Sequence, residues 1–475
     1  MVSPLVSSPT DVLHQIITYL PRRTLYNLCL ASTALRSVAE PFLYSSIQWT
    51  WTESQTPPIL SLLRSILRRP ELATFTQHFA LKGAAYEYDL DQIRGESPKI
   101  SPADDDLDAI IQCMQRIDVP YRDLWMEEIC TGTMDAFVAL LLSRLPRLRS
   151  LYLGENSTKE SCLVGMMFAS ALCDKSSNSL PSYEYLKGVE TAHLPPGVNI
   201  RARTDFEDRE DVLPFLLLPW VYSPSMDVLS LFYLPSVERI TAVVDNTATF
   251  AWPAKHPPSP LRLTALNLSV IREANLGQVL STTAHLQKLE WNWFYVADLE
   301  DSFLTETIDL DQTAAAFSHV RNTLTDLTIS ARSGSRRARP DFLPLRVAGK
   351  STAFSHLRVL KSLSVPLPFL LGFSPDGADT KLLRDVLPPN LEFLTITDDL
   401  YLQDEWQWRD ADFLQVLGLW LQDWRTSTPR LRGFRLFSKT MDYDEWGPPM
   451  RQKVKELGIQ AGVPVEITKL PGKIL

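Results

Sequence analysis

The chain has 475 residues, of which 45% are hydrophobic and 22% are charged, and its formal net charge at pH 7 is −9. This hydrophobic share predicts that most of the chain folds, either as one large domain or as a small domain beside an extended one. The acidic balance excludes a general nucleic-acid binder, which carries a basic surface. The five cysteines include no C-x-x-C pair, so neither a zinc site nor a disulfide framework is expected.

No segment predicts secretion or a membrane span. The N-terminus lacks a basic region followed by an apolar run, so no secretory signal is expected. The most apolar stretch, Leu213 to Tyr222, contains two prolines and is much shorter than the roughly 20 residues that cross a bilayer. We therefore expect a cytoplasmic or nuclear protein that has no membrane partner.

The first fifty residues predict three short helices. Apolar side chains at intervals of three and four residues place a stripe on the first helix, formed by Val12, Leu13, Ile16, Ile17 and Leu20. Thr10 is its expected N-cap, and Pro21 is expected to end it. Thr24 is the expected cap of a second helix that carries Leu25, Leu28 and Cys29, and a third helix is expected to start at Ser32 or Thr33 and to end at Pro41.

Three short helices bury little core, so we expect a partner protein to cover their remaining apolar surface. The pattern, together with the string Ala39-Glu40-Pro41-Phe42-Leu43-Tyr44, resembles the F-box over residues 5–50. Residues in step with that family are Pro9, Asp11, Leu13, Ile16, Leu20, Pro21, Leu25, Leu28, Leu35 and Arg36, while Ser8 replaces the family's first leucine. The alternative is that the helices only cap the domain that follows.

The F-box resemblance implies binding to the Skp adaptor, and through it to the cullin-based core of an SCF ubiquitin ligase. The expected adaptor-binding residues are Pro9, Val12, Leu13, Ile16, Ile17, Leu20, Pro21, Leu25, Leu28 and Leu35.

A three-position phrase recurs through the rest of the chain: an apolar residue, two variable residues, an apolar residue, one variable residue and an apolar residue. Good copies begin at Leu148, Leu263, Leu286, Leu324, Leu360, Leu391 and Leu431. Weaker copies lie at Phe79–Leu81, Leu124–Met126, Val189–Leu194 and Val237–Val243. Because the last two apolar positions are two residues apart, each copy predicts one face of a strand.

Helical segments are expected between these strands, over residues 108–117, 134–145, 161–173, 276–284, 313–321, 381–386 and 412–424. At the C-terminus, Pro448 to Leu457 predicts a helix that stops at Gly458, and Val463 to Ile467 predicts a last strand.

The alternation of helix, turn and strand resembles leucine-rich repeats, in which Asn156 would be the one surviving ladder asparagine. The expected fold class is α/β, with an N-terminal three-helix F-box followed by an irregular leucine-rich-repeat solenoid of parallel strands alternating with helices. The repeat domain would span residues 58–475, with a polar insertion near 86–107. An ordinary α/β domain whose strands share a leucine pattern is the alternative.

In the leucine-rich architecture the spacer residues of each strand face solvent. The expected client-binding residues, predicted to form one continuous surface, are Tyr152, Lys288, Glu290, Asn292, Asp326, Thr328, Phe393, Thr395 and Arg435. Mixed polarity with a few aromatic side chains suits protein recognition.

Few residues suggest chemistry. Gly349-Lys350-Ser351 is no P-loop, because Pro344 stands where that motif needs a glycine amide. The carboxylates Asp398, Asp399, Asp404 and Glu405 could hold a cation or transfer protons, but a turn beside solvent explains them more simply. Arginines between Arg332 and Pro340 could grip an acidic partner or form a solvated loop. No metal box is present, so no cofactor is expected.

The sequence therefore favours a non-enzymatic function: the substrate-recognition subunit of an SCF-type ligase, binding the Skp adaptor and an unknown client protein. The alternative is a leucine-rich-repeat scaffold outside any ligase. A third hypothesis is an enzyme that uses the carboxylates of residues 398–405.

Overall fold

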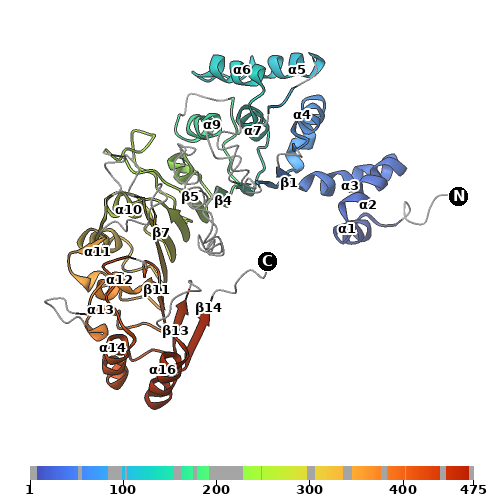
Figure 1. Ribbon diagram of the computed structural model, residues 1–475. Coiled ribbons are helices and arrows are strands. Elements are labelled where there is room, and N and C mark those ends of the chain that lie inside the picture. The colour runs from blue at the N-terminus through green and yellow to red at the C-terminus, as the bar shows by residue number, and fades with distance from the viewer. Residues whose placement is uncertain are drawn as a thin grey trace, which may run out of the picture. The chain divides into compact units, whose positions relative to one another are not determined.

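The computed structural model describes residues 8–51, 56–83, 99–101, 104–154, 162–174, 179–191, 228–247, 249–296, 305–334, 345–375, 382–401, 403–438 and 446–469. The chain divides into two compact units, whose helices and strands are labelled in Figure 1. The first comprises Met1–Ala192, Pro224–Val237 and Trp252–His256, and the second His193–Ser223, Glu238–Ala251 and Pro257–Leu475.

The first unit begins with three helices, α1 (Thr10–Thr18), α2 (Arg22–Ala31) and α3 (Thr33–Ser45). The three predicted helices are confirmed, but two of their boundaries differ from prediction. Pro21 is the N-cap of α2, so that helix begins before Thr24, and Pro41 lies inside α3 instead of ending it. An interior proline costs about 3 kcal/mol, and here the packing of Ala39, Phe42 and Leu43 in the helical core offsets that cost.

Strands and helices alternate in the rest of the first unit. In chain order the elements are β1 (Ser46–Trp51), α4 (Ile59–Arg68), η1 (Pro70–Phe75), β2 (His78–Gly83), α5 (Asp104–Met114), α6 (Arg122–Thr131), α7 (Met134–Leu142), β3 (Ser150–Leu153), α9 (Leu163–Leu172), β4 (Gly188–Thr191) and η3 (Leu229–Tyr233). Strands β1 to β4 are parallel and pair in chain order. Their register aligns four buried side chains, Ile47, Phe79, Leu151 and Val189.

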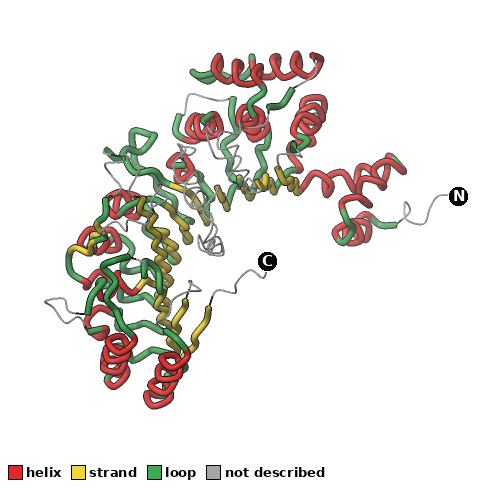
Figure 2. Tube along the Cα trace, viewed as in Figure 1, coloured by secondary structure: helices red, strands yellow, loops and turns green. Residues whose placement is uncertain are grey.

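The second unit repeats the same alternation. Its elements are β5 (Arg239–Val243), β6 (Ala265–Ser269), α10 (Glu273–Leu280), β7 (Lys288–Val296), β8 (Thr307–Asp309), α11 (Leu310–Ser318), β9 (Asp326–Gly334), β10 (Arg346–Ala348), η4 (Ser351–Ala353), β11 (Ser362–Pro366), α12 (Leu367–Leu371), α13 (Leu383–Val386), β12 (Phe393–Thr397), α14 (Asp410–Gln422), α15 (Trp424–Ser427), β13 (Gly433–Ser438), α16 (Pro448–Ala461) and β14 (Val465–Lys469). The main sheet is parallel, in the order β5-β6-β7-β9-β11-β12-β13-β14, and β8 pairs separately with β10. Helices lie along one face of the main sheet, and the opposite face is called the open face below (Figure 2).

The middle apolar residue of the recurring phrase forms the core of the second unit. Neighbouring strands align these residues in one row, which consists of Ile240, Leu266, Leu289, Leu327, Leu363, Leu394 and Phe434. Each side chain of the row is at most 2% exposed. Burial at about 25 cal/mol per Å² of apolar area makes this row a main source of stability.

The strands predicted from the seven good copies of the phrase are confirmed, as β3, β6, β7, β9, β11, β12 and β13. Among the weaker copies, Phe79–Leu81 lies in β2, the described part of Val189–Leu194 lies in β4, and Val237–Val243 overlaps β5. The prediction of a strand at Leu124–Met126 is wrong, because these residues lie in α6. There the buried residues are Trp125 and Ile129, which are four residues apart on one helical face. The predicted last strand is also confirmed, as β14.

The predicted helices are present with shifted ends. Helix α5 begins at Asp104, so the last four residues of the predicted polar insertion are helical, and residues 86–98 and 102–103 of the segment lie outside the described residues. Gly458 does not end α16, which runs to Ala461 and is capped by Gly462 with a left-handed φ of 69°. Asn156 also lies outside the described residues.

Candidate functional site

Helices α1, α2 and α3 form a small core of their own. Its buried residues are Ile17, Leu25, Cys29 and Ala39, and Leu20, Leu28, Val38, Phe42 and Leu43 pack against them. Among the predicted adaptor-binding residues, Leu13, Ile17, Leu25 and Leu35 are buried, Leu20 and Leu28 are half-buried, and Pro9, Val12, Ile16 and Pro21 are exposed. The predicted set therefore divides into a core half and a surface half.

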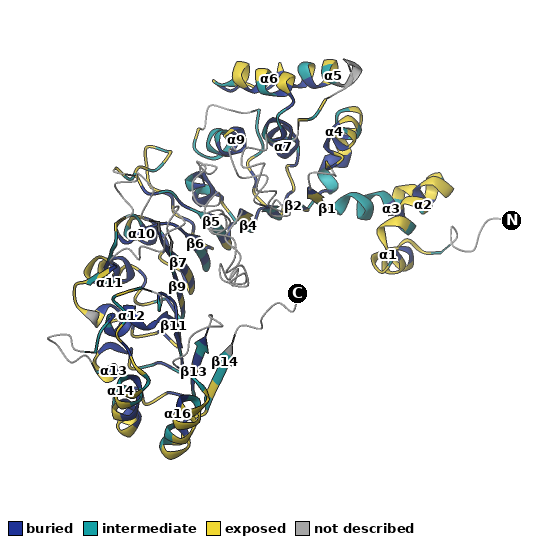
Figure 3. Cartoon of the chain, viewed as in Figure 1, coloured by how far each residue is buried: buried dark blue, intermediate teal, exposed yellow. Residues whose placement is uncertain are grey.

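A second set of apolar side chains remains in solvent on α1 and α2, whose exposed residues are yellow in Figure 3. On α1 and its C-cap it consists of Val12, Ile16 and the cap residue Tyr19, which are 44%, 40% and 88% exposed. On α2 it consists of Tyr26 and Leu30, which are four residues apart and 54% and 62% exposed. Of the twelve large hydrophobic side chains exposed among the described residues, these five lie within nineteen consecutive positions. We call them the exposed stripe.

The sequence prediction included Val12 and Ile16 and missed the other three residues of the stripe. Tyr19 continues the spacing of Val12 and Ile16 by three residues, so the helical period could have identified it. Tyr26 and Leu30 could have been found in the same way, since they lie beside Leu25 and Cys29 on α2 and four residues apart.

Polar contacts attach the three helices to the rest of the first unit. Arg69, the residue before η1, donates two hydrogen bonds of 2.7 Å to the carboxylate of Glu40 in α3, and a third of 2.8 Å to Glu71. These bonds raise the pKa of Arg69, and the bond from Arg69 lowers the pKa of Glu71. Arg22 of α2 donates to the carbonyl of Ser46, the residue at which α3 gives way to β1.

The second candidate surface is the open face of the sheet in the second unit. Register aligns Glu290, Thr328, Ser364, Thr395, Arg435 and Glu466 in one row across β7, β9, β11, β12, β13 and β14. The same face carries the other predicted client-binding residues of this unit, Lys288, Asn292, Asp326 and Phe393. Tyr152 lies in β3, in the other unit, and aligns with Ala80 and Glu190. Ser364 and Glu466 were not among the predicted contacts.

Many polar groups of the open face bind one another. Asn267 Nδ2 donates to the Glu290 carboxylate over 2.7 Å, and Asn292 Nδ2 donates to Asn267 Oδ1 over 2.9 Å. Arg435 pairs with Glu466 on the next strand. Phe393 is half exposed, and its ring lies close to where a Cβ of Gly433 would stand, so the glycine makes room for it. Phe393 is the exposed aromatic residue that such a face offers as an anchor.

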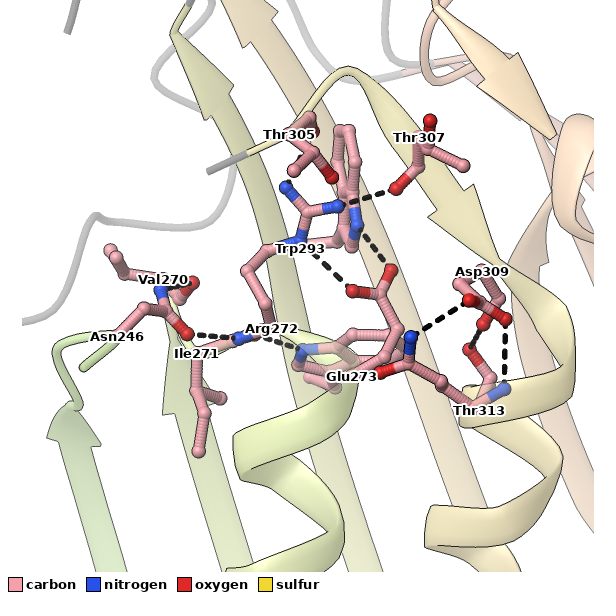
Figure 4. A network of polar contacts seen from close by, with 12 residues as sticks. Asn246, Val270, Ile271, Arg272, Glu273, Trp293, Thr305, Thr307, Asp309 and Thr313 are labelled. Atoms are coloured by element: carbon pink, nitrogen blue, oxygen red, sulfur yellow. Dashed lines mark hydrogen bonds and ion pairs between the residues drawn. The ribbon is translucent and has the colours of Figure 1, made fainter. Parts of the chain in front are cut away.

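A buried polar network lies at the carboxyl ends of β5, β6 and β7 (Figure 4). The Arg272 guanidinium donates to Glu273 and to the carbonyls of Thr305 and Thr307, at 3.0, 2.8 and 2.6 Å, and lies 4.5 Å from the centre of the Trp293 ring. Trp293 in turn donates to the second Glu273 oxygen over 2.9 Å. Sequence reasoning missed this network, because its members lie far apart in the chain. The charges of Arg272 and Glu273 neutralise each other away from solvent. The hydrogen bonds from Arg272 to the Thr305 and Thr307 carbonyls hold the backbone that leads into β8.

The carboxylates at residues 398–405 do not lie together beside solvent. Asp398 is fully buried and accepts a hydrogen bond from Ser438, and Asp399 is 7% exposed and accepts one from the Ala331 amide, each over 2.8 Å. The prediction of a solvent turn is therefore wrong for these two residues, which join β12 to β13 and to β9. Burial lowers the pKa of Arg332, and the charge of Asp399 opposes that shift.

The Gly349 turn is filled by a side chain of the protein. A Cβ at Gly349 would stand 2.7 Å from Asp311 Cγ, and the Lys350 amide donates to the Asp311 carboxylate over 3.0 Å. The Asp311 carboxylate thus fills the space beside the Gly349–Lys350 backbone in which a bound phosphate would have to lie.

No metal centre is found among the described residues, where no group of three or more His, Cys, Asp or Glu side chains could hold an ion. In the same part of the chain, no helix is both long enough and apolar enough to span a membrane. No protein-family model matches the chain, and no curated protein matches it.

Proposed function

We propose that this protein is the substrate-recognition subunit of an SCF-type ubiquitin ligase. Helices α1, α2 and α3 act as an F-box that binds the Skp adaptor, and the strands and helices that follow act as a degenerate leucine-rich-repeat domain that holds a client protein. The chain makes no bonds itself. It raises the local concentration of the client near the catalytic core that the cullin carries. The proposal places the protein in the cytoplasm or the nucleus.

The exposed stripe carries this proposal. The three helices have already used one apolar face to pack against one another, and Val12, Ile16, Tyr19, Tyr26 and Leu30 remain in water. Full burial of such a side chain is worth about 1.5–3 kcal/mol, and five large apolar side chains left in solvent on two consecutive helices favour an interaction site. A helical partner that covers the stripe provides that burial.

The repeat assignment rests on the second unit. Each turn places an apolar residue in the aligned core row, and the helices lie along the face of the sheet opposite the open face. Asn246 also behaves as a ladder asparagine does: its Nδ2 donates to the Val270 carbonyl at 3.0 Å, and its Oδ1 accepts from the Arg272 amide at 2.7 Å. One side chain thereby satisfies the backbone of the next repeat.

Adaptor binding is tested with Ile16→Asp in the full chain. Ile16 is 40% exposed, so the charge should leave the helices folded but place a carboxylate in the proposed interface. A hot-spot loss of about 2 kcal/mol weakens binding about thirtyfold. The measurement is retention of purified Skp adaptor on the immobilised chain.

Ile459→Asp is the matched control for this experiment. Ile459 lies on α16 and is 79% exposed, so it receives the same change outside the proposed interface. We expect the control to retain the adaptor. Equal retention by both variants and the unaltered chain would contradict the F-box assignment.

A scaffold outside any ligase remains the second candidate, because the contacts of Glu40 with Arg69 and of Arg22 with Ser46 suit helices that merely cap β1. Affinity purification of the full chain, and of a variant without residues 1–45, separates the two. The ligase function predicts that adaptor and cullin are present with the first and absent with the second. A cap predicts that neither sample contains them.

A further inference from the structure

We infer that the first unit binds an acidic segment of a partner protein at the amino ends of β2, β3 and β4. The inference goes beyond the proposed function, because it concerns a different surface from the exposed stripe and holds whether or not the chain binds an adaptor. Its basis is a pair of exposed arginines that lack the carboxylate partner found at the corresponding place in the second unit.

The same four residues, Pro-Arg-Leu-Arg, precede two strands of the chain. Pro146–Arg149 leads into β3 in the first unit, and Pro429–Arg432 leads into β13 in the second. In both copies the leucine is buried and both arginines are exposed. The copies are alike in sequence and exposure, so the difference between them comes from the neighbouring strands.

In the second unit, the neighbouring strand neutralises one arginine of the copy. The Arg432 amide donates to the Glu392 carbonyl over 2.7 Å, which places Glu392, the residue before β12, next to Arg432. The Arg432 guanidinium lies 3.2 Å from the Glu392 carboxylate. The charge of this arginine is therefore matched within the protein.

In the first unit, the neighbouring strands add positive charge instead. The Arg149 amide donates to the Gln77 carbonyl over 2.6 Å, and the Lys187 amide donates to the Arg149 carbonyl over 2.9 Å. Arg149 thus lies between Gln77 and Lys187, where its counterpart has Glu392 on one side. Within the described residues, no carboxylate forms an ion pair with Arg147 or Arg149.

Polar groups in the adjoining row can bind an anion together with these cations. Register aligns His78, Ser150 and Gly188 across β2, β3 and β4. His78 Nδ1 lies 2.7 Å from Ser150 Oγ, so a protonated Nδ1 donates to the hydroxyl oxygen and leaves the hydroxyl proton for an anion. Gly188 has no side chain to cover Ser150 from the other side. The basic surface is defined as His78, Arg147, Arg149, Ser150 and Lys187.

The basic surface is small and has a definite limit. Between Asp135 and Glu155 the sequence contains three arginines and no carboxylate, in a chain whose formal net charge is −9. One row further along the strands, Ala80, Tyr152 and Glu190 are aligned, and Glu190 returns the charge to negative. A cationic surface of this size suits a short acidic segment better than a nucleic acid, which needs a wider basic footprint.

The spacing of the cations favours several carboxylates over one phosphate. Arg149 and Lys187 belong to neighbouring segments, which in a sheet are about 4.8 Å apart, and Arg147 precedes Arg149 by two residues. Side chains two residues apart in an extended peptide project to the same side about 6.6 Å apart. Alternate Asp or Glu residues of such a peptide can therefore each meet a separate cation, and the arginine fork matches a carboxylate.

The test compares matched pairs of substitutions in the full chain. Arg147→Gln with Arg149→Gln removes two charges from the basic surface, and Arg430→Gln with Arg432→Gln removes the same two charges from the second copy. All four positions are exposed, so both variants should fold. Binding of a fluorescein-labelled hexaglutamate peptide is measured by fluorescence anisotropy, without adaptor, at about 0.05 and about 0.3 M NaCl.

We expect the Arg147 and Arg149 variant to bind hexaglutamate at least about tenfold more weakly than the unaltered chain, and the control to bind within about twofold. Higher salt should weaken binding by screening. Equal weakening of both variants, weakening of neither, or no binding by the unaltered chain would overturn the basic surface as the site. Equally tight binding of oligouridine, or of a peptide with one phosphoserine, would overturn the acidic segment as the partner. Adaptor retention tests the proposed function separately.

Discussion

Gly132 and Gly462 end α6 and α16 with nearly the same left-handed backbone, at φ 83° and 69°, but in different surroundings. A Cβ at Gly132 would stand 2.2 Å from the Ile100 carbonyl oxygen, which is backbone and cannot move aside cheaply. At Gly462 the nearest atom would be the end of the Arg425 side chain at 3.8 Å. The second glycine is needed only for its backbone angle, and the first also for its lack of a side chain.

Gly132→Ala should therefore destabilise the protein more than Gly462→Ala does. A left-handed alanine costs about 1–2 kcal/mol, which is the whole cost expected at Gly462. The collision with Ile100 should raise the cost at Gly132 to about 3 kcal/mol or more. Urea unfolding of the two full-length variants, followed by circular dichroism, measures both. Equal urea midpoints for the two variants would show that the backbone at Ile100 moves aside at little cost in free energy.

Cysteine reactivity provides a second test at this scale. Cys113 is buried, and desolvation raises the pKa of its thiol, against smaller opposing effects of Arg144 and Arg116. Cys130 is exposed. Since the thiolate is the reacting form, we expect maleimide at pH 7 to modify Cys130 and to spare Cys113 in the folded protein. Peptide mass spectrometry measures the ratio of modified Cys130 to modified Cys113, and this ratio should approach one in urea. Rapid modification of Cys113 without denaturant would contradict its burial.

At the scale of elements, side-chain hydrogen bonds join successive strand-and-helix turns of this protein, in addition to the backbone hydrogen bonds of the sheet. Asn246 joins the end of β5 to the turn after β6, and Arg272 joins that turn to β8. Asp398 and Asp399 do the same for β12, β13 and β9. Val270, between Asn246 and Arg272 in this network, has a φ of 73°, which is strained for a β-branched residue. The bond from Asn246 helps to hold it there.

Asn246→Ala should cost at least about 2 kcal/mol, because it leaves the Val270 carbonyl and the Arg272 amide buried without their partner. Asn275→Ala is the control, since Asn275 makes one 3.5 Å contact with the Thr247 carbonyl and is half-buried. Its effect should stay within about 0.5 kcal/mol. Thermal unfolding of both variants tests the difference. A loss no larger than that of the control would mean that the turn rearranges around another donor.

Paired changes at the carboxylates address the enzyme hypothesis. Asp399→Asn replaces a buried carboxylate that accepts a hydrogen bond from the Ala331 amide, whereas Asp404→Asn changes an exposed side chain. We expect the first to destabilise the fold by about 1–3 kcal/mol and the second to have little effect. Calorimetric melting measures both. An unchanged melting temperature for Asp399→Asn would reopen the question of a role other than structure.

At the scale of the whole molecule, stability should be unevenly distributed. The core of α1, α2 and α3 contains four buried residues, whereas the aligned row of the second unit crosses seven strands. A small core supports a small local free energy of opening.

We therefore expect backbone amides of α1 and α2 to exchange with deuterium faster than those of β6, β7, β9, β11 and β12. Adaptor binding should slow exchange in α1 and α2 while the strands of the second unit stay unchanged, because burial of the exposed stripe is linked to folding of these helices. Hydrogen exchange with mass spectrometry measures both states. Equal protection of helices and strands without the adaptor would contradict the expected distribution.

Local patterns alone determined where most strands and helices of this protein lie. The recurring apolar phrase located its strands, because a strand with one buried face must alternate every second residue. The helical form of α1 followed from its apolar spacing in the same way. Both signals lie within a few residues of sequence, so no knowledge of the fold was needed to find them.

Only the tertiary structure decided which apolar stripe of α1 packs inside and which remains in water, because Leu13 and Ile17 on one side and Val12 and Ile16 on the other are equally apolar in sequence. The same holds for Pro41, kept inside a helix by packing, and for Asp398 and Asp399, buried by partners 40 and 68 residues away. Contacts between residues so far apart in the chain depend on the register of the sheet, and no short pattern contains that register.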